Sequence, residues 1–138
     1  MLKRKSLKGM TGIYVVVEDV GTELKGTITR RDIQSRVEAQ LHTAGIRIVK
    51  EKEAAKLPGE PYLYVNVAAL PLERNRFTCR IDLEVHQHVA LVHDAKGGHA
   101  ITWEQGVLTM GEIANICQQL DELVFAFICD YLAINPLK

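Results

Sequence analysis

The sequence is short of the features that mark the specialised protein classes. It has three cysteines, Cys79, Cys117 and Cys129, an odd count at wide spacing that does not suggest a disulfide framework. Its 17 basic and 17 acidic side chains give a net charge of zero, so nothing global indicates a nucleic-acid or membrane-surface partner. No run reaches the roughly 20 apolar residues that span a bilayer, so the chain is not expected to be transmembrane.

The short motifs that carry catalysis are missing as well. There is no GxSxG, HExxH or CxxC pattern, and Gly97–Gly98 lacks the further residues of a phosphate-binding loop. A nucleophilic cysteine needs a nearby base and an electropositive site, and the sequence shows neither. Cys79 and Cys117 fall on predicted apolar faces and are interpreted as buried thiols. We therefore expect no catalytic residue and no cofactor.

The chain does contain enough apolar material for one folded domain. It has 138 residues, of which 47% are hydrophobic, and no internal repeat or linker. Residues 1–11 are predicted to be a flexible basic tail, followed by a single α/β domain over residues 12–138. No apolar stretch follows the basic run at residues 3–8, so no signal peptide is expected in the chain as given. The run is interpreted as a solvated tail, the remainder of an export signal or a weak electrostatic anchor.

Two helices are predicted. The longer covers about residues 110–133, where apolar side chains recur at steps of three, four and one and so share one broad side. That side is too wide for a coiled-coil seam, so the helix is expected to lie on a sheet. A capping box is predicted at its start, over residues 109–112. The other helix begins after the N-cap Thr29, with Asp32 completing an acidic capping box, and ends at Gly45.

Strands are predicted where residue types alternate. They cover residues 13–18, 46–49, 62–70, 77–92 and 100–105, separated by a charged loop at 50–61, turns at 73–75 and 96–98, and a loop between Gly106 and Gly111. The first strand is apolar on both alternate sets and is expected to be central and covered on both faces. The strand at 77–92 alternates cleanly between apolar and polar side chains, which is typical of a sheet with one wet face.

These elements follow one another as β-α-β-β-β-β-α. The first strand, helix and second strand are expected to form a right-handed crossover with the two strands parallel. The later strands form a meander, which is antiparallel. The sequence therefore predicts an α+β fold: a mixed, mostly antiparallel sheet with two helices packed on one face.

Several segments of this order resemble a known group of proteins. They are residues 7–12 (LKGMTG), 61–65 (PYLYV), 102–104 (TWE) and 130–136 (DYLAINP), together with the helix that starts at a threonine and ends at residues 44–46 (AGI). With the strand order, they resemble the amino-terminal domain of TolB, the LpoB-like envelope domains and a family of uncharacterised, usually exported bacterial proteins. The resemblance spans nearly the whole chain. It implies a fold and a place in the bacterial envelope, and it implies no catalytic residues.

Candidate metal ligands lie on the polar face of the strand at 77–92. His86 and His88 stand two residues apart, so both imidazoles emerge on one face, and Glu84 precedes them on it. Two imidazoles so placed can share zinc or copper, with the carboxylate as a third ligand. The alternative interpretation is a solvated strand face that holds no metal. Asp82 and Glu84 are also paired carboxylates, but an open sheet face lacks the cleft that acid–base catalysis on a glycoside needs.

A candidate partner surface consists of Tyr62, Tyr64 and Arg80. With Arg47 these side chains offer the aromatic and basic chemistry that suits single-stranded nucleic acid. The carboxylates on the same face oppose a polyanion, and the segment matches no known RNA-binding motif, so no nucleic-acid partner is expected. The other interpretation is cross-strand packing between a tyrosine and a long side chain.

These patterns favour a non-catalytic binding domain that meets an unknown protein partner in the bacterial cell envelope. No convergent polar site is visible, and a long sheet with one wet face can recruit a partner through that face or by strand addition at its edge. The alternatives are a metal-binding protein that uses His86 and His88, and a binder of single-stranded nucleic acid. The chain is expected to be a monomer or weak homodimer, periplasmic or secreted if a leader has been removed and otherwise cytoplasmic.

Overall fold

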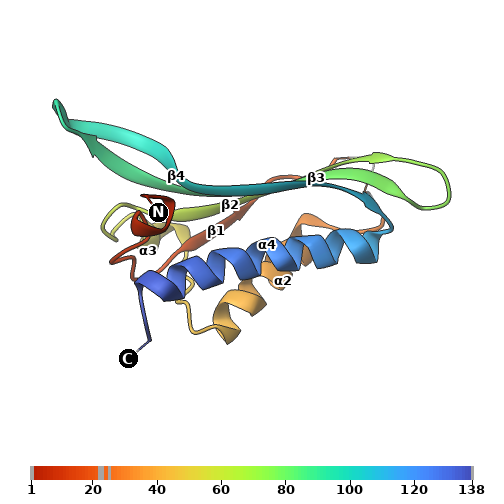
Figure 1. Ribbon diagram of the computed structural model, residues 1–138, viewed down its shortest axis with the longest axis horizontal. Helices are drawn as coiled ribbons and strands as arrows, with labels where there is room; N and C mark the ends of the chain where they lie inside the picture. The colour runs from red at the N-terminus through yellow and green to blue at the C-terminus, as the bar shows by residue number, and fades with distance from the viewer. Residues whose placement is uncertain (1, 22–23, 25, 138) are drawn as a thin grey trace.

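The computed structural model describes residues 2–21, 24 and 26–137 and shows one sheet with its two long helices on one face (Figure 1). The elements are α1 (Leu2–Lys5), β1 (Tyr14–Val17), α2 (Arg30–Thr43), α3 (Glu51–Ala54), β2 (Tyr62–Pro71), β3 (Phe77–Leu91), β4 (Asp94–Gly111) and α4 (Ile113–Ile134). The strand order is β1-β2-β3-β4, with β1 and β2 parallel and the other pairs antiparallel. This confirms the predicted α+β class and the mixed, mostly antiparallel sheet.

The core lies between the inner face of the sheet and the two long helices. Alternate side chains of β2 and β3 are buried there, and α4 buries the side that its periodicity predicted, from Ile116 to Tyr131. Trp103 of β4 meets Phe127 of α4 edge to face, with ring centroids 5.3 Å apart. Both long helices therefore cover the same face of the sheet, as expected (Figure 1), and the opposite face carries no helix from α2 or α4. Within the described residues, no helix is both long and apolar enough to cross a bilayer.

Local sequence signals set both ends of α2. The Thr29 hydroxyl accepts a hydrogen bond from the Asp32 N–H at 3.0 Å, and the Asp32 carboxylate accepts one from the Thr29 N–H at 2.9 Å. This is the predicted capping box. At the other end Gly45 adopts a φ of +82°, and the Ile46 N–H donates to the Leu41 carbonyl at 3.0 Å. That pattern closes the helix with a left-handed residue, as predicted.

The first half of the sheet differs from the prediction. Residues 46–49 do not form a strand: Ile48 makes only an isolated parallel bridge to Ile13. The parallel neighbour of β1 is instead β2, which lies beyond the short helix α3 in the predicted charged loop. β1 is thus an edge strand of the sheet, and the expectation that it is central and covered on both faces is wrong. Its outward side chains, Tyr14 and Val16, are half-buried.

The carboxyl-terminal half of the sheet is longer than predicted. The chain turns at Val92–His93, not at residues 96–98, and β4 then runs without interruption through the predicted loop between Gly106 and Gly111. Gly97 lies inside this strand, at an irregularity in its pairing with β3, with a φ of +53°. A Cβ atom there would lie 1.7 Å from the Val89 carbonyl oxygen. Gly97, which suggested a turn, therefore accommodates a close backbone contact within a long strand.

The start of α4 also differs from the prediction. Thr109 belongs to β4, and the N-cap of α4 is Glu112, whose side chain makes no capping hydrogen bond. The capping box expected at residues 109–112 is therefore absent, because the strand continues to Gly111 and leaves no room for a cap at Thr109. Tertiary packing of the apolar side stabilises this helix instead.

The amino-terminal segment lies against the domain, where a flexible tail was expected. Leu7 is fully buried, and the Asn135 side chain donates to the Leu7 carbonyl and accepts from the Gly9 N–H, both at 2.8 Å. The Tyr131 hydroxyl donates to the Met10 carbonyl at 2.6 Å. The segment is mostly polar, so its sequence does not indicate this packing. Two buried apolar residues, Leu7 and Met10, are enough to anchor it.

Candidate functional site

The candidate site is the outer face of the sheet, the face turned away from α2 and α4. Residues paired across neighbouring strands share a face, and residues two apart along a strand do too. The positions on the outer face are Tyr14 and Val16 of β1; Tyr62, Tyr64, Asn66, Ala68 and Leu70 of β2; Thr78, Arg80, Asp82, Glu84 and His86 of β3; and Glu104, Gly106, Leu108 and Met110 of β4. This face has an aromatic end, a charged middle and an apolar end.

At the aromatic end, tyrosine and histidine rings form a contact cluster. The Tyr62 and His86 rings stack with centroids 4.7 Å apart and planes 8° from parallel, and Tyr64 meets His86 edge-on at 5.9 Å. The tip of the β3–β4 hairpin bends away from the helices (Figure 1) and carries His99 to 6.1 Å from the Tyr62 ring. Irregularities in the β3–β4 pairing at Val85/His86 and Val89/Leu91 account for this bend.

Hydrogen bonds to carboxylates fix two rings of this cluster. His86 Nε2 lies 2.9 Å from Glu84 Oε1, and the Tyr64 hydroxyl donates to Glu18 Oε2 at 2.8 Å. Desolvation, with the bond to Glu18 and the nearby carboxylates, raises the pKa of Tyr64 to about 12. Tyr64 therefore stays a neutral hydrogen-bond donor at physiological pH. The two hydrogen bonds orient the aromatic rings of the cluster.

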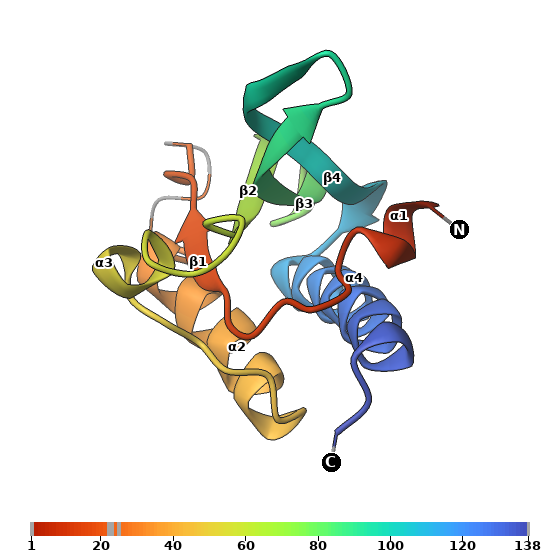
Figure 2. The same cartoon turned by 90° about the vertical axis from the view of Figure 1, so that its left-hand side faces the viewer.

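A pocket of about 450 Å³ adjoins the aromatic cluster. It lies between α3 and the outer side of β1 and β2, and its lining consists of Tyr14, Val16, Glu51, Ala54, Ala55, Glu60, Tyr62, Tyr64 and His99. Figure 2 shows α3 beside β1, with the β3–β4 hairpin rising on the other side. The sequence pointed to Tyr62 and Tyr64, whose alternation places them on one face. It did not point to Tyr14, α3 or His99, because those depend on which strands pair and on how the hairpin bends.

The charged middle of the face holds Arg80. Its guanidinium pairs with Asp82 at 3.0 Å, two rows along the sheet from Tyr64. The predicted combination of Tyr62, Tyr64 and Arg80 thus shares a face, but Arg80 is engaged by a carboxylate. Arg47 pairs with Glu53 and is not an outer-face residue. The structure therefore does not gather the basic side chains that the nucleic-acid interpretation needs.

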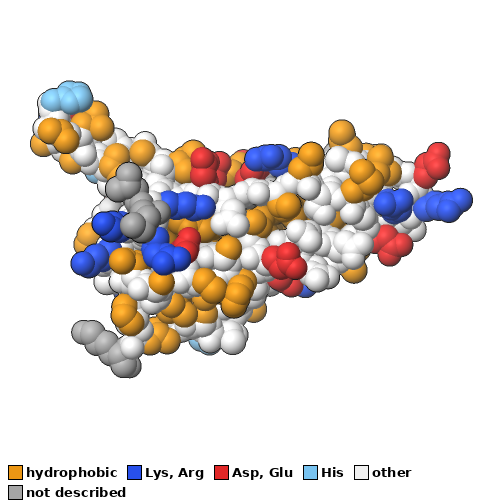
Figure 3. Space-filling view, in the orientation of Figure 1, with side chains coloured by type: hydrophobic (Ala, Val, Ile, Leu, Met, Phe, Trp, Pro, Cys, Tyr) orange, Lys and Arg blue, Asp and Glu red, His pale blue; other side chains and the backbone are white. Residues whose placement is uncertain are grey.

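The apolar end of the face is exposed. Leu70, Leu108 and Met110 are 64%, 68% and 58% exposed, and the strand register places Leu70, Thr78 and Met110 in one row across three strands. We call Ala68, Leu70, Leu108 and Met110 the apolar strip. In the space-filling view, hydrophobic side chains gather along the upper right of the molecule, over the end of the β2–β3 hairpin (Figure 3).

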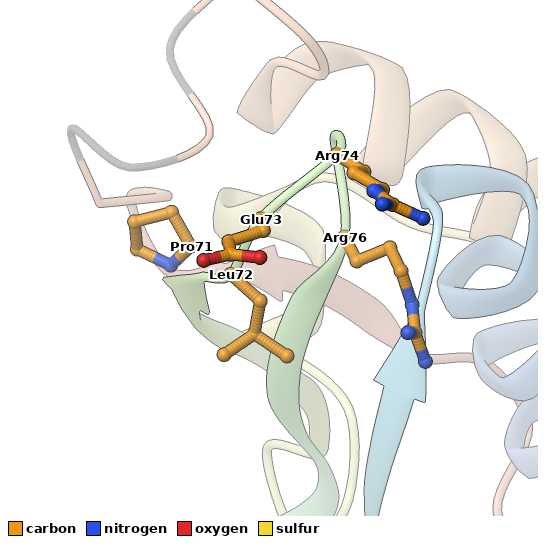
Figure 4. Close-up of a pocket in the computed structure, with 5 residues that line it drawn as sticks. All are labelled: Pro71, Leu72, Glu73, Arg74 and Arg76. Carbon is orange, nitrogen blue, oxygen red and sulfur yellow. The ribbon is translucent and has the colours of Figure 1, made fainter.

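A hollow of about 780 Å³ lies beside the β2–β3 turn, next to the apolar strip. It is lined by Pro71, Leu72, Glu73, Arg74 and Arg76. Figure 4 shows both arginines reaching to one side of the hairpin, away from Pro71 and Leu72. All five residues come from the exposed end of the β2–β3 hairpin, where Arg74 and Asn75 both have a φ of +60°. The hollow is therefore open space beside a hairpin, and its side chains do not converge on a ligand.

The candidate metal ligands are only partly brought together. His86 is bonded to Glu84, but His88 lies next to His99, with ring centroids 5.8 Å apart, and the backbone N–H of His88 donates to the Gly59 carbonyl at 2.8 Å. Across the described ranges, no group of three or more histidine, cysteine, aspartate or glutamate side chains is placed to hold a metal ion. The geometry therefore offers pairs of ligands and no complete coordination set.

The cysteines differ in their surroundings. Cys79 is buried in the core, where desolvation raises the pKa of its thiol to about 11; Cys117 is half-buried and its pKa is also raised, mainly by burial. A raised pKa keeps both as thiols, the less reactive form. Cys129 is exposed on α4 and lies on the side of the molecule opposite the outer face.

Comparison with known proteins supports the fold. No family model and no curated protein matches the sequence. The hypothetical protein CT253 from Chlamydia trachomatis is similar in structure, with a TM-score of 0.52 and 11% identity over 88% of this chain and 99% of that chain. PelC from Paraburkholderia phytofirmans, solved as a dodecamer, has a TM-score of 0.50 and 14% identity over 83% of this chain and 86% of that chain. At such identities both likenesses show the fold alone.

Proposed function

We propose that this protein is a non-catalytic binding domain that engages a protein partner through the outer face of its sheet. The observation that carries the proposal is the apolar strip: large apolar side chains exposed in register at one end of a face that α2 and α4 leave open. Thr78 and Arg80 of β3 lie between the β2 and β4 members of the strip, and exposed apolar side chains bordered by polar ones are typical of an interaction surface.

The long edge of the sheet adds a second means of attachment. β4 is the last strand in the order and spans 18 residues, so one row of its backbone groups has no neighbouring strand among the described elements. Ser6 covers part of that row, because its hydroxyl donates to the Thr102 carbonyl at 3.0 Å. The rest is available for strand addition, in which backbone hydrogen bonds supply affinity and outer-face side chains supply specificity.

The proposed location is the bacterial cell envelope, supported by the resemblance to TolB and LpoB-like domains in the sequence. Fractionation of cells that express the gene from its own start codon tests this proposal, and recovery with cytoplasmic markers alone would contradict it. On its own the chain is proposed to be a monomer or weak homodimer. Because the structurally similar PelC was solved as a dodecamer, sedimentation velocity over a wide concentration range is the appropriate test, and a discrete ring-sized species would overturn the proposal.

Site-specific photo-crosslinking tests the binding function directly. A photoreactive phenylalanine analogue replaces Leu108, in the apolar strip, or Gln118, which is exposed on the helix side. We expect a discrete crosslinked protein from the Leu108 position in cells and none from Gln118. When the probe is placed at Met110 instead, we expect the same crosslinked protein. Adding Leu108→Glu to that variant should abolish it. Identical crosslinking patterns at both positions, or only background at Leu108, would contradict the proposal.

A further inference from the structure

We infer that the pocket between α3 and β1–β2 binds the guanidinium group of an arginine side chain, supplied by the protein partner. The identity of the source rests on the proposed function, whereas the chemistry of the pocket stands on its own lining. The volume of about 450 Å³ falls within the range of roughly 300–1,000 Å³ that is usual for ligand pockets. The pocket is distinct from the apolar strip, which lies at the other end of the same face.

The lining is rich in aromatic rings and carboxylates. Three tyrosines, Tyr14, Tyr62 and Tyr64, line it together with His99 and the acidic residues Glu51 and Glu60, and its lining within the described residues includes no lysine or arginine. Neither glutamate takes part in a salt bridge or side-chain hydrogen bond within the described part of the chain. Two carboxylates without a cation partner, beside three electron-rich rings, make a site that attracts positive charge.

Further carboxylates stand behind the rings. The Tyr64 hydroxyl is bonded to Glu18 at 2.8 Å, and His86, stacked on Tyr62, is bonded to Glu84 at 2.9 Å. Each bond polarises its ring toward a negative charge. An anion such as a phosphate would meet repulsion from these groups, which disfavours nucleotides and polyanions as ligands of the pocket.

The shape of the lining favours a guanidinium over an ammonium group. A guanidinium is flat, stacks on aromatic faces and donates two parallel hydrogen bonds to one carboxylate. Tyr62 and Tyr14 are direct neighbours across the parallel β1–β2 pair, and Val16 with Ala54 supplies apolar surface for the aliphatic stem of the side chain. An ammonium group is more strongly hydrated and uses neither the stacking nor the paired hydrogen bonds.

Titration of the isotopically labelled protein with small probes, followed by backbone amide NMR shifts, tests the inference. The probes are N-acetyl-arginine amide, N-acetyl-lysine amide and the neutral arginine isostere N-acetyl-citrulline amide. We expect the arginine probe to shift amides of α3, β1 and β2, and the lysine probe to bind about tenfold more weakly, as one lost stacking contact implies. The citrulline probe should not bind. Equal binding of citrulline and arginine would overturn the inference.

Matched variants separate the pocket from the fold. Glu60→Gln and Tyr62→Leu should each weaken binding of the arginine probe, while Glu73→Gln, on the exposed β2–β3 turn, should leave it unchanged. The amide spectrum of each variant shows whether it has folded. Unchanged arginine binding by folded Glu60→Gln and Tyr62→Leu would refute the inference. If the Leu108 crosslink forms and no probe binds, the pocket inference alone fails; if the arginine probe binds and no crosslink forms, only the proposed function fails.

Discussion

At the scale of single residues, the sharpest determinant is the cap of α2. The Thr29 hydroxyl satisfies a backbone N–H of the first helical turn that would otherwise have no acceptor. We predict that Thr29→Ala lowers the free energy of unfolding by about 1 kcal/mol, measured by urea denaturation. Thr11→Ala, at an exposed position, is the control. A urea denaturation midpoint for Thr29→Ala equal to that of the unmodified protein would contradict the role of the cap.

The second residue of the cap gives a dependence on pH. Hydrogen bonds from the backbone and the side chain of Thr29 lower the pKa of Asp32. A carboxyl whose pKa is lower in the folded state contributes stability above its unfolded pKa, near 3.9, and loses it as the pH falls through the folded value. We predict that the stability difference between the unmodified protein and Asp32→Asn is full at pH 7 and shrinks below about pH 4. Thr11→Ala, which removes no titratable group from an exposed position, is the control. A constant difference for Asp32→Asn would contradict the prediction.

At the scale of elements, α4 provides the firmest test of the core. Leu120 and Phe127 are 2% and 0% exposed, whereas Glu122 is exposed on the opposite side. We predict that Leu120→Ala and Phe127→Ala each cost about 2–5 kcal/mol, because each leaves a cavity. Glu122→Ala should change stability by less than about 0.5 kcal/mol. Chemical denaturation of the three variants checks this, and a cost at Glu122 equal to that at Leu120 would mean that α4 faces the other way.

The elements also show which parts of the fold the sequence could predict. The ends of α2 and the alternation of β2 and β3 depend on signals a few residues apart, and the structure confirms them. Gly97, Gly98 and Gly106 are local signals of turns, so the sequence predicts two shorter segments where the structure has the single strand β4. In the folded protein the pairing of β4 with β3 continues past these glycines. A prediction from residues close together in the sequence cannot take this long-range pairing into account.

The same limit applies to the candidate site. Period-two alternation correctly placed Tyr62 and Tyr64 on one face of their strand and Glu84 and His86 on the polar face of theirs. The pairing of the two strands then brings them to one face of the sheet. Tyr14 joins them only because β1 pairs with β2 rather than with residues 46–49. α3, four residues long, lies below the length at which sequence periodicity is informative. The pocket therefore depends on how the strands pair, whereas the position of Tyr62 and Tyr64 on one face of their strand can be predicted from the sequence.

At the scale of the whole molecule, the two chain ends hold each other. Leu7 is fully buried, and Asn135 bonds the backbone of the amino-terminal segment at two points. We predict that Leu7→Ala costs about 2–5 kcal/mol, as for any large apolar side chain lost from a core. Lys8→Ala, one residue later and exposed, should change stability by less than about 0.5 kcal/mol. Thermal and urea unfolding measure both, and equal stability of the two variants would show that the segment contributes nothing.

Whether the folded molecule gains stability from a metal ion is decided by the geometry around the histidines. The His86 ring stacks on Tyr62 and shares a hydrogen bond with Glu84, so zinc would have to replace that bond. His88 lies beside His99, and a structural zinc site requires about four ligands in a closed tetrahedron with partners that orient the rings. The pairs on the outer face meet neither requirement.

We therefore predict that equimolar zinc at pH 7.5 leaves the melting temperature unchanged. A ligand that binds only the folded state would raise it, and a true site would weaken as the pH falls below about 6.5, where protons compete for imidazole. His86→Ala is the decisive variant, with His42→Ala, exposed at the end of α2, as its control. A rise of several degrees that His86→Ala loses and His42→Ala keeps would make metal binding, rather than partner binding, the function of this end of the sheet.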